Sequence, residues 1–216
     1  MLSNIETGNS LPIHQEVRGI QGKRIVLVAN SEVSKAATAL LAGQGAHVFF
    51  AAANDEDLGA LSGAVAHARG EGEGMVAGTE NSEEMRRFLS RAKRQLGQVD
   101  VLVYQPTSEN TLPDSGNNLL DEIIHHMRMQ GSGHIITISA SNSATAELRR
   151  RAASLGIRVT RVEPTMEHYG WTGSLIEYDR AAGIANCIYE SIAQPFAADV
   201  VFMQDPFENQ FSGQML

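Results

Sequence analysis

Short runs of apolar, often β-branched residues alternate along this chain with longer segments of helical pattern, and this alternation restricts the fold more than any other feature. Strands are predicted at 24–29, 47–53, 75–77, 99–104, 134–138, 157–162 and 199–203. Helices are predicted between them at 34–42, 55–69, 82–96, 117–130, 144–155 and 179–193. Apolar runs of this kind are typical of strands buried on both faces, and strands separated by helices form parallel βαβ units. The sequence therefore predicts an α/β fold with a doubly wound parallel sheet and helices on both faces.

The length of 216 residues suits one well-packed domain. Residues 1–20 are polar and show no period, so they are predicted to form an N-terminal arm that precedes a domain at 21–216. A net charge of -8 argues against a nucleic-acid surface, because phosphate binding requires an excess of Lys and Arg. No stretch approaches the ~20 apolar residues of a membrane span. No secretory signal is visible, and a single cysteine, Cys187, fits a reducing compartment, so a cytoplasmic location is expected.

Several segments carry recognisable fragments in a fixed order along most of the chain. They are GKRIVLV at 22–28, LGQVDVLV at 96–103, GSGHIITIS at 131–139, GIRVTRVEP at 156–164 and FSGQ at 211–214. Together they resemble the short-chain dehydrogenase/reductase (SDR) family. The resemblance implies a single Rossmann-like domain, here shortened relative to the family between Thr107 and Ser139 and again between Ser141 and Gly156.

The family's glycine-rich turn after the first strand, which admits the cofactor pyrophosphate to a helix N-terminus, has no counterpart here. The turn is ANSEVSKA at 29–36, and no glycine lies between Gly22 and Gly43. Every position therefore carries a Cβ where the resemblance implies that the pyrophosphate needs room. Glu32 adds a negative charge, which Lys35 offsets only in part. No cofactor is expected on this ground, and NAD or NADP enters only under the alternative of an active enzyme.

The next two strand ends also depart from the family. Residues 51–54 are AAAN, without the acid or base that contacts the ribose or its phosphate in the family. Asp55 is expected to cap the helix that follows, with contact to the ribose as the alternative. After the fourth strand the family's Asn-Asn-Ala-Gly is replaced by YQPT at 104–107. Tyr104 and Pro106 are expected to fill space that small residues leave open in the family.

The family's catalytic set is a serine followed by Tyr-x-x-x-Lys, in which the tyrosine transfers the proton. Ser139 or Ser141 stands near the serine position, and Ser139 is predicted to be its vestige. No tyrosine or lysine occurs from Ser139 through Val162, and the last lysine of the chain is Lys93. No catalytic or cofactor-binding residue is therefore predicted.

Other candidate groups have simpler interpretations. His125 and His126 are adjacent on a helix and point about 100° apart, so they cannot share a metal ion and no metal is expected. The run of arginines at 149–151 is typical of a solvated helix end, with a partner-binding patch as the alternative. The loop around Trp171 corresponds to the family's mobile substrate loop, and it covers either a residual pocket or an empty cleft.

In the family, two helices build one subunit interface, and the last strand and tail build another. Amphipathic helices and a tail ending at 213–216 are present at these positions. The resemblance therefore favours a non-catalytic subunit, a pseudoenzyme, that forms a homo-oligomer or a hetero-oligomer with an active SDR partner. The alternatives are a divergent NAD(P)-dependent oxidoreductase and a small-molecule-binding regulatory module that uses the cleft.

Overall fold

A computed structural model describes residues 19–106, 114–139, 142–164, 174–194 and 200–202. Strands and helices alternate throughout. The order is β1(Arg24–Val28), α1(Ser31–Gly43), β2(His47–Ala52), α2(Asp55–His67), β3(Glu71–Val76), α3(Ser82–Leu96), β4(Val101–Tyr104), α4(Asp114–Gln130), β5(Gly133–Ile138), α5(Asn142–Ala152), β6(Ile157–Glu163), α6(Ser174–Ala193) and β7(Val200–Phe202). All neighbouring strands pair in parallel in a 7-stranded sheet of order β3-β2-β1-β4-β5-β6-β7. The predicted fold is confirmed.

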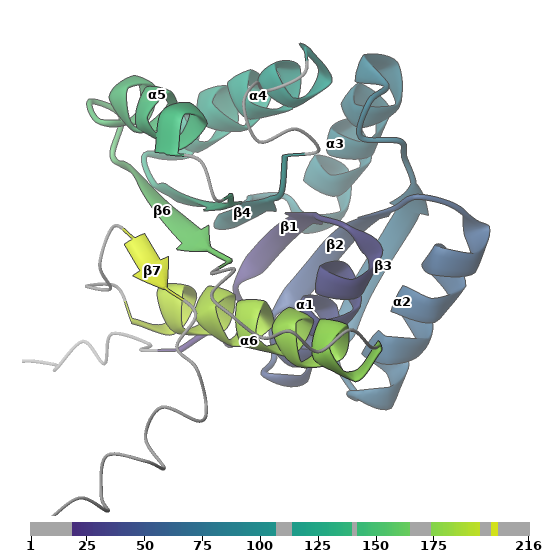
Figure 1. Cartoon of the computed structure of the whole chain (residues 1–216). Helices are drawn as coiled ribbons and strands as arrows, with labels where there is room; N and C mark the ends of the chain where they lie inside the picture. The colour runs from purple at the N-terminus through teal and green to yellow at the C-terminus, as the bar shows by residue number, and fades with distance from the viewer. Residues whose placement is uncertain (1–18, 107–113, 140–141, 165–173, 195–199, 203–216) are drawn as a thin grey trace, which may run out of the picture.

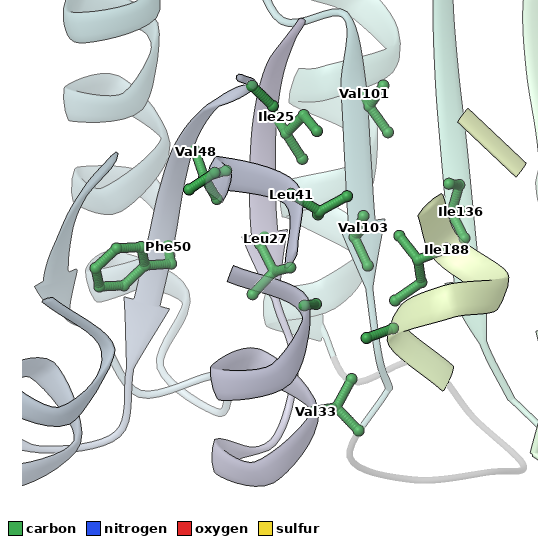
Figure 2. Close-up of a cluster of buried hydrophobic side chains, with 14 of the residues drawn as sticks. Ile25, Leu27, Val33, Leu41, Val48, Phe50, Val101, Val103, Ile136 and Ile188 are labelled. Carbon is green, nitrogen blue, oxygen red and sulfur yellow. The ribbon is translucent and has the colours of Figure 1, made fainter. Parts of the chain in front are cut away.

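Two hydrophobic clusters cover the two faces of the sheet, because successive side chains of a strand point to opposite faces. In β1, Ile25 and Leu27 belong to the cluster with α1, α2 and α6, whereas Val26 and Val28 belong to the cluster with α3, α4 and α5. Figure 1 shows these two groups of helices on opposite sides of the sheet. Figure 2 shows the first cluster, in which side chains from β1, β2 and β4 meet those from α1 and α6.

The third strand is longer than the sequence predicted. It begins at Glu71, and Gly72 and Gly74 alternate in it with exposed glutamates, which hides the apolar signal of a strand. Glycine is required at position 74, because a Cβ there would overlap the Phe50 ring and lie 2.7 Å from the Phe50 carbonyl oxygen. The other predicted elements are present, and their ends differ by a few residues, as at Ser31 for α1 and Ala152 for α5.

Some predicted features lie outside the described residues: the arm up to residue 18, Ser141, the loop around Trp171 and the C-terminal tail. The boundary of the arm stays a prediction, although Ile20 is only 3% exposed and packs in the core with α1. None of the helices in the described ranges has the length and apolar character needed to span a membrane.

A polar cluster is buried where β5 and β6 meet the end of α6. His134 Nε2 lies 2.9 Å from Thr160 Oγ1, and Arg158 Nη2 donates to His134 Nδ1 at 2.8 Å and to the Ser191 carbonyl oxygen at 2.6 Å. Burial, together with the positive charges of Arg158 and Lys23, lowers the pKa of His134 to about 3. The imidazole is therefore neutral, and since Nδ1 accepts, Nε2 carries the proton and donates to Thr160.

The depressed pKa of His134 makes the fold sensitive to acid. An unfolded histidine has a pKa of ~6.5, so between that value and about 3 the unfolded chain binds more protons and stability falls as the pH falls. We expect His134 to contribute a loss of about 2 kcal/mol in the free energy of unfolding from pH 7 to pH 5. Urea unfolding at both pH values should show that His134→Gln removes this part of the loss. The exposed His67→Gln is the control and should keep it; an unchanged loss in His134→Gln contradicts the assignment.

Candidate functional site

A cavity of ≈ 690 Å³ opens beyond the carboxyl ends of β1, β2, β3 and β4. The chain leaves β1 toward β2 and β3 on one side of the sheet and later returns to β4 on the other, so β1 and β4 flank the topological switch point. Ligands of doubly wound sheets bind in the crevice at this point. The volume is within the range of pockets that hold small molecules and cofactors. The described lining residues are Ala29, Asn30, Ser31, Ser34, Ala51, Ala52, Ala53, Asp57, Leu61, Ala77, Gly78, Thr79, Glu80, Asn81, Glu84, Gln105 and Pro106.

The space beside the first turn is open, although no glycine is present there. The wall is made of small side chains such as Ala29 and Ser31, while Glu32 and Lys35 are exposed and are not among the lining residues. The expectation that Tyr104 fills the cleft is wrong. Its side chain is only 2% exposed and packs in the cluster with α3 and α4, on the other side of the sheet from α1. Pro106 does line the cavity.

The β1–α1 turn is held by hydrogen bonds within the chain. Asn30 is the N-cap of α1: its Oδ1 accepts from Val33 N at 3.0 Å, and its carbonyl oxygen accepts from Ser34 N at 2.8 Å. Asn30 N itself donates to Gln105 Oε1 at 3.1 Å, and Ser34 Oγ donates to the Ala29 carbonyl oxygen at 3.0 Å. The positive end of the α1 dipole thus faces the cavity in a preformed turn.

The start of α2 forms the adjacent wall. Its N-cap is Asn54 and not Asp55 as the sequence suggested: Asn54 Oδ1 accepts from Asp57 N at 2.9 Å. Asp57 Oδ2 accepts from Asn54 Nδ2 at 3.1 Å and from Ser31 Oγ at 2.9 Å. The Ser31–Asp57 hydrogen bond joins the first turns of α1 and α2 across the cleft. Sequence reasoning missed Asp57, because only the fold brings it to Ser31.

The third wall is the turn between β3 and α3. Glu84 Oε2 accepts from Gly78 N at 2.7 Å, and Glu84 Oε1 accepts from Asn81 Nδ2 at 2.9 Å. Asn81 Oδ1 caps α3 by accepting from the amides of residues 83 and 84. Together with Asp57 and Glu80, Glu84 makes the cavity acidic, and no lysine or arginine is among its described lining residues.

The predicted vestigial serine is not part of this cavity. Ser139 follows β5, is 5% exposed, and is not among the described lining residues. Its N–H donates to the Val162 carbonyl oxygen at 3.1 Å, and its own carbonyl oxygen accepts from Arg161 Nη1 at 3.4 Å. Arg161 Nη2 also pairs with Glu163 Oε2 at 2.6 Å. The catalytic origin of Ser139 stays a prediction.

The remaining candidate groups do not gather into a second reactive site. In the described part of the chain, no three His, Cys, Asp or Glu side chains lie close enough together to hold a metal ion. His126 lies on α4, and its pKa is lowered by burial and by the nearby Lys93 and His125. Cys187 on α6 is half-buried, and burial together with Glu190 raises the pKa of its thiol. A raised pKa leaves little of the reactive thiolate.

Comparison with solved structures shows that this fold is the SDR fold. A 7α-hydroxysteroid dehydrogenase in complex with NADH and 7-oxo glycochenodeoxycholic acid has a TM-score of 0.68 and 16% sequence identity, over 86% of this chain and 94% of that chain. A hydroxysteroid dehydrogenase from Escherichia coli has a TM-score of 0.71 and 16% sequence identity, over 87% of this chain and 97% of that chain. A metagenomic short-chain oxidoreductase in complex with NADP has a TM-score of 0.65 and 19% sequence identity, over 87% of this chain and 100% of that chain. No protein-family model matches the chain, and no curated protein does.

These likenesses correct one prediction. The sequence predicts no cofactor, yet solved proteins with this fold are complexes with NADH and NADP and align with the chain over almost their full length. The fold is therefore a nucleotide-cofactor fold, and the prediction of no cofactor is wrong. It failed because it equated the loss of glycine in the first turn with a filled cleft. The structure shows alanine and serine along an open one.

The N-cap of α1 is predicted to hold the wall of the cavity in place. We expect Asn30→Ala to lower the free energy of unfolding by about 1 kcal/mol, because Val33 N loses its hydrogen-bond acceptor. Urea unfolding measures the change. Asn30→Asp is the matched control: aspartate caps as well as asparagine, so its urea midpoint should stay near that of the unchanged protein. An equal loss in both variants would show that Asn30 acts through something other than its cap.

Proposed function

We propose that this protein binds a nicotinamide nucleotide in the cleft between β1, β2, β3 and β4 and does not itself transfer the hydride. It would act as a non-catalytic SDR-fold subunit. The observation that carries the proposal is the open cavity of ≈ 690 Å³ at the switch point, beside the capped N-terminus of α1. Helix N-termini with free first-turn amides attract the phosphates of such ligands. Complexes of the SDR fold with NADH and NADP support the same class of ligand.

The absence of proton-transfer chemistry rests on the residues of the chain. Hydride transfer to a carbonyl carbon, or from an alcohol carbon, needs a group that donates a proton to the reacting oxygen or accepts one from it. No Tyr-x-x-x-Lys pair occurs between Ser139 and Val162, and no lysine follows Lys93. Tyr104, at the end of β4, is 2% exposed, and burial raises its pKa to about 12, so it is a poor acid. It is not among the described residues that line the cavity.

A divergent oxidoreductase is the second candidate, because the same open cleft and the same neighbours are compatible with it. The two candidates share the binding step and differ in turnover. Single-turnover mixing of the protein and NADH with a panel of ketones and aldehydes separates them, since only an oxidoreductase would consume the absorbance of the reduced nicotinamide.

Binding itself gives the first test. We expect calorimetric titration with NADH to yield a dissociation constant in the micromolar range. Ala53→Trp should weaken it at least about tenfold, because the indole enters the cavity from the exposed end of β2 and costs the ligand well over 1 kcal/mol of contact and space. Ala60→Trp, on the exposed face of α2, is the control and should bind as the unchanged protein does. Binding that survives Ala53→Trp would place the ligand elsewhere.

Assembly is the second part of the proposal. The resemblance to the family implies that two of the helices build a subunit interface, either with a second copy or with an active SDR subunit. Light scattering after size exclusion should give a mass that is a multiple of the chain mass, or co-purification from the native host should recover an active SDR partner. A monomer that recovers no such partner contradicts this part, and leaves the binding part to its own test.

A further inference from the structure

Gln105 connects the two strands that flank the switch point. Its backbone N–H donates to the Val28 carbonyl oxygen at 2.8 Å, which anchors the end of β4 to the end of β1. Its side-chain Oε1 accepts from Asn30 N at 3.1 Å, so the carboxamide reaches over the β1–α1 turn. Both residues line the cavity. The Gln105 oxygen thus occupies the Asn30 amide at the N-terminus of α1. An anionic oxygen of a ligand would bind to this same amide.

The negative charge of the cavity also opposes the binding of a phosphate. Asp57, Glu80 and Glu84 line it, and no described lining residue is a lysine or an arginine. The Asp57 and Glu84 carboxylates accept hydrogen bonds from neutral donors, namely Ser31, Asn54, Asn81 and a backbone amide. Their charge therefore acts on a phosphate with no lysine or arginine among the described lining residues to offset it. The nucleoside part of a ligand has no such conflict, because it is neutral.

We propose that Gln105 is the specificity-determining residue of this cleft, an internal competitor that a ligand phosphate must displace from the Asn30 amide. This inference rests on the proposed function and adds which part of the ligand the cleft prefers. The nucleoside end carries no anionic oxygen that competes with Gln105 for the Asn30 amide, whereas the diphosphate binds there only after the Gln105 carboxamide has moved. Gln105 thereby lowers the affinity for phosphorylated ligands relative to the bare nucleoside.

Calorimetric titration with adenosine, ADP and NADH tests the proposal on the full chain. We expect Gln105→Ala to tighten ADP and NADH about three- to tenfold, the equivalent of one hydrogen bond, and to leave adenosine unchanged. Gln105→Met keeps the volume of the side chain without the acceptor and should show the same gain, which also covers the case in which the alanine variant is poorly folded. Gln105→Glu keeps an acceptor and adds a charge, so it should weaken ADP and NADH. Gln44→Ala, at the exposed far end of α1, is the matched control and should change nothing.

An unchanged ratio of ADP to adenosine affinity in both Gln105→Ala and Gln105→Met overturns the proposal. So does an equal gain for all three ligands, because it would mean that the side chain only occupies space. If either of these results is obtained but NADH binds the unchanged protein, the inference about Gln105 fails and the proposed function stands. If none of the three ligands binds the unchanged protein or any variant, the proposed function fails and the inference with it.

Discussion

The burial of β1 on both faces is the constraint on which the rest of the structure depends. Ile25, Val26, Leu27 and Val28 are each 0% exposed, so the strand needs helices above and below it, and the chain supplies α1, α2 and α6 on one face and α3, α4 and α5 on the other. A parallel sheet covered in this way has both faces buried, so its strand ends and its edge strands are what remain accessible. The carboxyl ends of β1 to β4 therefore fix the position of the cleft, and the turn residues decide how much space it leaves.

Because the sheet fixes the position of the cleft, the cleft is present without the glycine-rich turn. The position of the crevice follows from the strand order, which the apolar pattern of the chain encodes. The turn residues decide only what the crevice holds. Here they are small enough to leave it open and polar enough to bind one another: Asn30 with Gln105, and Ser31 with Asp57. We propose that these hydrogen bonds within the cleft set its selectivity for ligands.

The sheet could be predicted from the sequence because it rests on local patterns. Helix α3 begins and ends at the predicted residues, with Asn81 as its cap. The misses have other causes. The length of β3 is underestimated from the sequence, because Gly74 is required by contact with Phe50 on the neighbouring strand and carries no strand signal of its own. The position of Tyr104 is mispredicted because the face to which a strand residue points depends on the register of the strand. The roles of Asp57 and Gln105 could not be predicted from the sequence, because each depends on a hydrogen bond to a residue far away along the chain. Asp57 is bonded to Ser31, and Gln105 to Asn30.

The central claim is that the switch-point cleft binds a nicotinamide nucleotide although its glycine turn is gone. Titration of the isotope-labelled protein with NADH, followed by the backbone amide resonances, tests it most directly. The account predicts shifts confined to the amides around the cavity, in the β1–α1 turn from Asn30 to Ser34, at the end of β2 around Ala53, and at Gly78 after β3. No shift at saturating NADH, or shifts that spare these three turns and appear on another face, would contradict it.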